Sequence, residues 1–309
     1  MGMGTDHVTT SVANNFIPEL WSDEVLGAYK SNLVLANVVT KINHKGKKGD
    51  TIHIPVPARG SASTKSANSQ VTLIASTNTS KDISLNQHYE YSKLIEDIAE
   101  VQSLSSMRKF YTDDAGYALA KQVDTSLFET AETLQGGTAG GTAAALWETA
   151  VIGSDGSTFT GATSNAADIA DAGIRAMILK LDDADAPMDN RALVIPPIAA
   201  NDLLGINRFT EQQYIGSGDA IKTGKIGMIY GVDVYVSSNC PTITSGDSVS
   251  CRVGLMIHQS ALAFAEQMAV RSQTQYKQEY LGDLFTADCI YGIGELRDDA
   301  GVAFVVPAA

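Results

Sequence analysis

Residues Glu100 to Leu134, EVQSLSSMRKFYTDDAGYALAKQVDTSLFETAETL, carry the pattern that decides the fold of this chain. Apolar residues recur there every three or four positions: Val101, Leu104, Met107, Tyr111, Ala115, Leu119, Val123, Leu127, Ala131 and Leu134. This spacing predicts one α-helix with a continuous apolar face. At 1.5 Å per residue it would be roughly 50 Å long, which exceeds the usual globular range. We therefore expect a spine against which other elements lie, even though Gly116 weakens it locally.

The stretch after this helix predicts a boundary and a second unit. Adjacent glycines in Gly136-Gly137-Thr138-Ala139-Gly140-Gly141 let the backbone turn sharply, so we expect a hinge there. Helices and strands then alternate, which favours a mixed α/β unit. Within this unit, the expected helices cover 165–181 and 198–204, and the expected strands cover 192–195 and 232–237. Further strands are expected at 253–258, 285–296 and 302–306, and these could form a sheet with the arm or the spine.

The stretch before the long helix predicts two projecting elements. Residues 17–42 have helical apolar spacing with Pro18 in the first turn, which predicts an amphipathic helix. Residues 49–91 predict a long hairpin, because 51–56 alternate as a strand does while Pro55 confines that strand to an edge. Residues 60–80 are mostly Ser, Thr, Ala and Asn and contain too few large apolar residues to form a core of their own.

Composition excludes several classes of protein. The chain has 309 residues, enough for about one to three compact units. Its formal net charge of −13 repels phosphate, so a protein that grips nucleic acid is not expected. No apolar run approaches the ~20 residues of a membrane helix, and residues 1–15 do not read as a secretion signal. The three cysteines, an odd number, indicate reduced and buried thiols.

The sequence contains no recognisable catalytic, metal-binding or nucleotide-binding motif. The five histidines are scattered without metal-ligand spacing. The stretch Gly218 to Ile226 approaches a phosphate-binding loop, but five residues separate its glycines instead of four, and Ile226 replaces the Ser or Thr that would hold magnesium. We therefore expect no catalytic, cofactor-binding or metal-binding residues, and no enzyme activity.

Several segments, taken in order, resemble the major capsid proteins of tailed bacteriophages, which have the Hong Kong 97-type fold. Asn15 to Trp21, followed by Gly49 to Pro55, is similar to the N-terminal arm that leads into the family's extended loop. Arg191 to Pro197 and Gly224 to Asn239 resemble the axial domain, and Asp288 to Arg297 resembles the end of the peripheral domain.

The resemblance implies an α+β fold with an N-terminal arm, an extended β-hairpin loop, a peripheral domain with the spine helix and a mixed α/β axial domain. The implied division is 1–45 for the arm and its helix, 46–95 for the extended loop, 96–140 with 258–309 for the peripheral domain, and 141–257 for the axial domain.

The resemblance also implies a coat protein whose hexamers and pentamers form an icosahedral head around double-stranded DNA, held by confinement and without sequence-specific binding. Such a protein resides in the virion capsid, and in the host cytoplasm during assembly, with no membrane partner. A separate scaffolding protein is implied because no long charged extension precedes Asn15, and a portal and a decoration protein are further partners. Inter-subunit contacts are expected at Phe16, Trp21, Arg59 and Lys65.

Two other functions remain open from sequence. An encapsulin-like bacterial compartment shell shares this fold but encloses enzyme cargo instead of DNA. A divergent nucleotide-dependent α/β enzyme is the alternative from a different class, and it is motivated only by the stretch Gly218 to Lys225.

Overall fold

The computed structural model describes residues 34–46, 48–56, 60–71, 73, 79–98, 107–136, 150–161, 165–206, 227–244 and 248–308. Several predictions fall outside these residues: the helix over 17–33, the first turns of the long helix before Met107, the glycine run after Gly136 and the stretch 218–226.

The predicted spine is α3, which runs from Met107 to Ala131 and is followed by a short 3-10 turn, η2, at Leu134–Gly136. The buried apolar residues of α3 are Ala115, Leu119, Leu127, Phe128 and Ala131, and all except Phe128 belong to the predicted apolar series; Asp124 and Ser126 are buried as well. The α-helix ends at Ala131, three residues before the predicted end at Leu134, and the φ of 61° at Gln135 breaks the helical path within η2.

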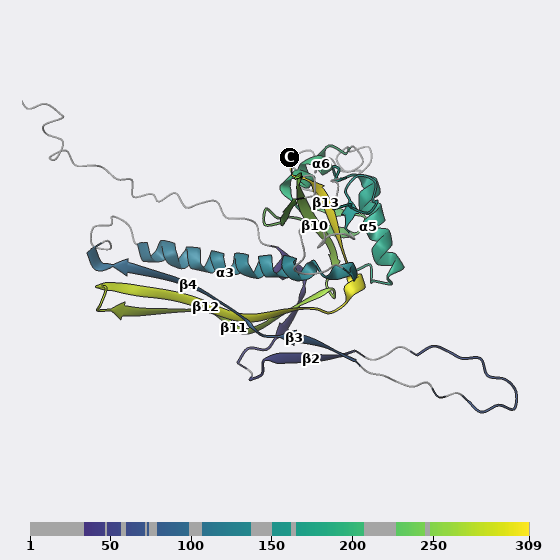
Figure 1. Cartoon of the computed structure of the whole chain (residues 1–309), viewed down its shortest axis with the longest axis horizontal. Helices are drawn as coiled ribbons and strands as arrows, with labels where there is room; N and C mark the ends of the chain where they lie inside the picture. Colours follow the sequence, from purple (N-terminus) through teal and green to yellow (C-terminus); the bar gives the residue numbers. More distant parts are fainter. Residues whose placement is uncertain are drawn as a thin grey trace, which may run out of the picture.

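A four-stranded sheet lies along the spine (Figure 1). Its order is β1 (Thr40–Asn43), β11 (Leu262–Lys277), β12 (Gly282–Glu295) and β4 (Gln87–Glu96), with β1 parallel to β11 and the other pairs antiparallel. Alternate residues of β12 face the helix and form a core with it: Phe285, Ala287, Cys289 and Tyr291 pack with Ala115 and Leu119.

The helix predicted to extend to Ile42 is wrong at its C-terminal end. Only a short α1 (Leu35–Val38) forms, Val39 is already extended, and Thr40–Asn43 are strand β1. Val38, Val39, Thr40 and Ile42 are all β-branched, and such side chains favour strands. Pairing of this segment with β11 therefore overrides its helical spacing.

The second unit is built on a seven-stranded sheet. Its main path runs β5 (Val151–Ile152), β13 (Gly301–Pro307), β10 (Ser250–His258), β6 (Arg191–Ile195), β8 (Val232–Val236) and β7 (Met228–Ile229), and β9 (Thr242–Thr244) pairs with β10. Helices α5 (Asp171–Asp183) and α6 (Pro197–Leu204) contribute buried residues to the core of this sheet. The mixed α/β unit predicted from the alternating pattern is present, and the three cysteines are free and buried as predicted.

The helix predicted to begin at Asn165 begins six residues later, at Asp171. Ala170 is extended, and its N–H donates to the carbonyl of Gly153 at 2.7 Å. This long-range hydrogen bond replaces the first helical turn, and the sequence pattern does not contain it.

The chain crosses between the two sheets near its C-terminal end. Strand β10 belongs to the seven-stranded sheet, β11 and β12 belong to the four-stranded sheet, and β13 returns to pair with β10. Strand β13 therefore lies in a different sheet from β11 and β12, although all three fall within 258–309.

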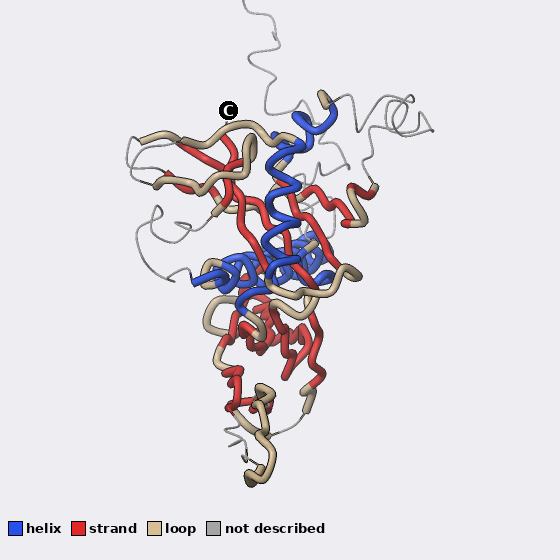
Figure 2. Tube along the Cα trace, turned by 90° about the vertical axis from the view of Figure 1, so that its right-hand side faces the viewer, coloured by secondary structure: helices blue, strands red, loops and turns tan. Residues whose placement is uncertain are grey.

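The third element is the predicted hairpin, which is shorter than the predicted 49–91: it is formed by β2 (Thr51–Val56) and β3 (Thr79–Ser84), while residues 87–91 belong to β4. Among the described strands, β2 and β3 form a two-stranded sheet of their own. Figure 1 shows α3 on one side of the four-stranded sheet and this hairpin on the other. In Figure 2, the seven-stranded unit lies above, the four-stranded sheet below it, and the hairpin loop at the lowest point.

Candidate interaction surfaces

The base of the hairpin is seated on the four-stranded sheet by one apolar face. Ile83 is 1% exposed, and it packs with Ala263 and Ala265 of β11. Ile52 and Ile54 of β2 join the same cluster because they lie on the same face of the two-stranded pair. Burying these side chains attaches the hairpin to the sheet.

Two glycines of β12 make room for this seat. A Cβ atom added at Gly294 would lie 2.7 Å from Cγ1 of Ile83, and one added at Gly292 would collide with the carbonyl oxygen of Ser84. Any larger residue would push the hairpin away from the sheet. The alternation Gly292-Ile293-Gly294 in a strand is a signal of close backbone approach that sequence reasoning could have used.

Polar contacts on the two faces of the hairpin differ. On the outer face, His53 Nδ1 lies 2.6 Å from Asp82 Oδ1, and the imidazole lowers the pKa of that carboxyl group. On the face toward the sheet, Lys81 Nζ lies 3.0 Å from Oε1 of Glu295 at the end of β12. The second oxygen of Glu295 lies 3.1 Å from the Thr133 hydroxyl, which shares its one proton between this carboxylate and the carbonyl of Thr130 at 2.8 Å.

Beyond its base the hairpin is exposed. Every described residue from 60 to 71 is solvent-exposed, Lys65 included. Val71 is 62% exposed and Leu73 is 90% exposed. Within the described loop residues, the backbone N–H and the hydroxyl of Ser69 both donate to the carbonyl of Ser66, a local contact. The tip thus offers apolar side chains and backbone groups that its own chain leaves uncovered.

A second exposed surface lies at the far end of the four-stranded sheet. The Gln267 carbonyl of β11 still accepts a hydrogen bond from the Gly46 N–H, but beyond Gln267 the described residues pair β11 with β12 alone, which leaves the other edge of β11 open. Val270, Tyr276, Tyr280 and Leu281 are exposed there. Such an edge is open to pairing with another chain.

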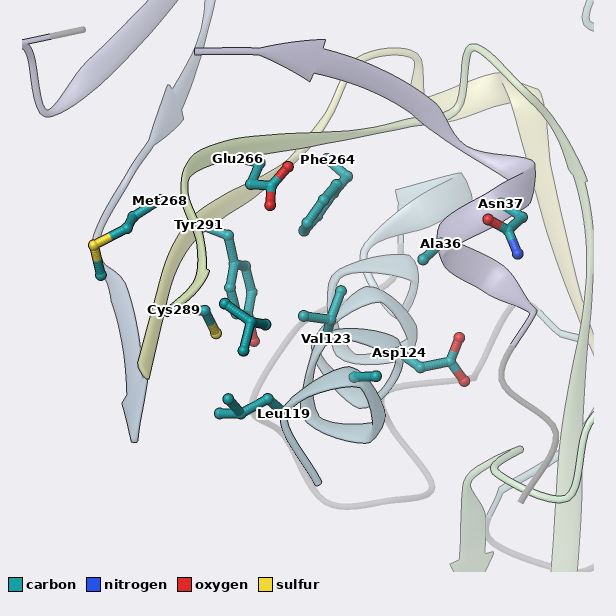
Figure 3. Close-up of a pocket in the computed structure, with 12 residues that line it drawn as sticks. Ala36, Asn37, Leu119, Val123, Asp124, Phe264, Glu266, Met268, Cys289 and Tyr291 are labelled. Carbon is teal, nitrogen blue, oxygen red and sulfur yellow. The ribbon is translucent and has the colours of Figure 1, made fainter. Parts of the chain in front are cut away.

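A groove of about 300 Å³ lies between α3, α1, residues 264–270 of β11 and the neighbouring part of β12 (Figure 3). Its lining is mainly apolar, with Leu119, Val123, Phe264, Met268 and Tyr291 among the residues. Burial raises the pKa of Tyr291 to about 12 and also raises the pKa of the Cys289 thiol. Both groups are therefore neutral near pH 7.

Asp124, at the edge of this groove, joins three parts of the chain. Its carboxylate accepts hydrogen bonds from the Leu35 N–H at 2.9 Å and from Asn239 Nδ2 at 3.1 Å. The side chain is fully buried, and burial raises the pKa of the carboxyl group against the opposing effect of these hydrogen bonds. This contact ties the N-terminal segment and the seven-stranded unit to the spine.

Of the four residues predicted to make inter-subunit contacts, the structure places Lys65 on the exposed hairpin tip. Phe16, Trp21 and Arg59 lie outside the described residues. Sequence reasoning missed the contact among Lys81, Thr133 and Glu295, whose members are far apart in the chain.

Within the described parts of the chain, no group of three or more His, Cys, Asp or Glu side chains is placed to hold a metal ion. No helix in those parts is long and apolar enough to cross a membrane.

Comparison with known proteins gives one family and a set of solved structures. A family model described as "Phage capsid protein" matches residues 17–300. A structure from Mycobacterium phage Che8 is 24% identical, with a TM-score of 0.75, and the match covers 94% of this chain and 97% of that one. The capsid of cyanophage P-SCSP1u is 18% identical, with a TM-score of 0.71 and coverage of 100% and 98%. The mature capsid of bacteriophage PhiM1 is 14% identical, with a TM-score of 0.67 and coverage of 95% and 93%. No curated protein matches significantly.

Proposed function

This chain belongs to the phage capsid protein family, and from that premise we propose that its copies form the hexamers and pentamers of an icosahedral head around the double-stranded DNA of a tailed phage. As a member of the family it is a structural component of the virion capsid and not an enzyme. Its mixed α/β fold is that of the solved phage capsids, as the resemblance implied. The division into arm, extended loop, peripheral and axial domains belongs to the proposal.

One observation supports the assembly role most strongly: the hairpin tip is uncovered by its own chain. Residues 60–70 are small or polar, but Val71 and Leu73 beside them are 62% and 90% exposed. Contact with a neighbouring copy would remove this apolar surface from water, at about 25 cal/mol per Å². Lys65 is the described residue that we propose for this contact, with Arg59, Phe16 and Trp21 as the others.

The acidic net charge supports the proposal that the genome is enclosed without being bound tightly. A wall built from subunits with a formal charge of −13 would repel phosphate, so DNA would be confined without being held tightly. The remaining proposed partners are a separate scaffolding protein, a portal and a decoration protein. The family description favours a phage head over an encapsulin-like shell, and the nucleotide-enzyme alternative receives no support from it.

Shortening the hairpin tip tests this function. Deleting 60–80 would remove Thr79 and Ser80, which pair with Val56 and Pro55, so the cleaner change replaces 61–70 with a two-residue glycine linker. We expect the variant to be folded and soluble but unable to form closed shells, as judged by electron microscopy.

Two further variants make this test specific. Replacing 61–70 with Gly and Ser at equal length keeps the loop length and removes its side chains. Lys65→Glu changes one exposed charge, and we expect it to lower the yield of shells without changing the unfolding midpoint. Closed shells at the wild-type yield from the shortened variant would contradict the proposed function.

A further inference from the structure

We infer that Glu295 is a positioning residue that fixes the direction in which the hairpin leaves the body of the subunit, with Lys81 and Thr133 as its partners. The inference rests on the proposed function in one respect: the direction matters because the tip is to meet a neighbouring copy. The orientation itself is a property of the single subunit.

The apolar seat fixes where the hairpin touches the sheet. Ile83 is the deeply buried anchor of β3 and sits against Gly294, and the half-buried Ile52 and Ile54 of β2 join it in the same cluster. Apolar contacts are non-directional, so the hairpin could still tilt on this seat. Lys81 lies two residues further toward the tip than Ile83 on the same face, about 6–7 Å along the strand. Its contact with Glu295 therefore adds a directional polar contact at the end of the seat nearest the tip.

Glu295 is itself held from the body of the subunit. Its side chain is 19% exposed, and its two oxygens meet different partners: Lys81 Nζ at 3.0 Å and the Thr133 hydroxyl at 3.1 Å, which also donates to the Thr130 carbonyl. Thr133 lies two residues after the end of α3, and its neighbour Leu134 is buried in the core. The carboxylate therefore contacts the end of the spine as well as the hairpin.

The strength of the contact suits a positioning role. A partly exposed ion pair changes an equilibrium by up to about fivefold, which is too little to hold the fold together. It is enough to favour one orientation of a hairpin over a tilted one. Because the tip lies many residues beyond Lys81, a small tilt at the base displaces the tip by a large distance.

The test uses the unassembled full-length subunit with one spin label on the hairpin and one on the spine. Ser80→Cys and Lys121→Cys provide two exposed sites, and the wild-type chain without them shows whether the buried native thiols react. Pulsed electron paramagnetic resonance then gives the distribution of distances between the labels. We expect a narrow distribution in the doubly labelled protein and a clearly broader one when Lys81→Met is added to it, with an unchanged unfolding midpoint.

Reversing the two charges separates this role from simple packing. Lys81→Glu with Glu295→Lys restores an ion pair in the same place, so we expect the narrow distribution and the wild-type yield of closed shells to return. Arg175→Gln is the matched control, because it removes the pair with Asp171, a carboxylate of similar exposure, on α5. It should leave the distribution unchanged.

Two outcomes would overturn the inference: an unchanged distribution in Lys81→Met, or a broad distribution that the reversed pair does not narrow. The distances are measured before assembly. If the shortened loop still gave closed shells while Lys81→Met broadened the distribution, the proposed function would fail and the role of Glu295 would stand.

Discussion

At the scale of single residues, Asp124 shows how one buried carboxylate connects three parts of the chain. It meets the Leu35 N–H, Asn239 and the surrounding core, and the neighbouring Cys240 thiol is neutral because burial raises its pKa to about 12. A buried charge is costly unless it is hydrogen-bonded. The hydrogen bonds to Asp124 therefore favour the arrangement in which the N-terminal segment, the spine and the seven-stranded unit meet.

The burial of Asp124 predicts how its contribution to the free energy of unfolding changes with pH. Burial raises the pKa of Asp124 in the folded chain, so the folded state keeps the proton to a higher pH than the unfolded state, where the pKa is about 4. The stabilisation from this group is fully present below the unfolded pKa and is lost as the pH rises through the folded pKa.

Asp124→Asn removes the titration and keeps one acceptor. The free energy of unfolding of the wild type, minus that of the variant, is expected to fall as the pH rises from about 4 toward neutral. Urea unfolding of both proteins across this range measures it. A difference that stays constant or grows with pH would show that Asp124 is not buried as described.

At the scale of elements, the spine and the buried strands were predictable because their patterns are local. The apolar spacing of α3 and the runs in β6, β10 and β13 carry the information within one segment. The errors occur where distant segments decide: β1 forms against β11, and the start of α5 is fixed by Gly153. Long-range pairing of this kind outweighs intrinsic propensity.

Two glycines allow a contrast between elements. Gly116 lies on an exposed part of α3 with nothing within 4 Å of an added Cβ, so Gly116→Ala is expected to stabilise the chain by about 0.5–1 kcal/mol. Gly254 lies in β10, where a Cβ would collide with the ring of Phe304, so Gly254→Ala is expected to destabilise it. Thermal unfolding of the two variants checks both signs; equal shifts would contradict the packing of the two sites.

At the scale of the whole molecule, the sequence predicted that a loop projects from the chain, but it did not predict the contacts that hold this loop. A loop of small polar residues with too few apolar ones for a core indicated a projecting tip, and Lys65 lies there. The contact of Lys81 with Glu295 joins residues 214 positions apart, so no local pattern could reveal it. Likewise the crossing of the chain between two sheets, which returns β13 to β10, depends on pairings that the sequence alone does not rank.

The central claim is that the exposed tip of the hairpin is covered by another copy of the chain. Electron cryomicroscopy of particles formed by the full-length protein, expressed alone and with a scaffolding partner, tests it most directly. The account predicts closed shells of hexamers and pentamers in which residues 60–71 lie against a neighbouring subunit. Shells in which that loop folds back on its own subunit, or a chain that stays monomeric under both conditions, would contradict it.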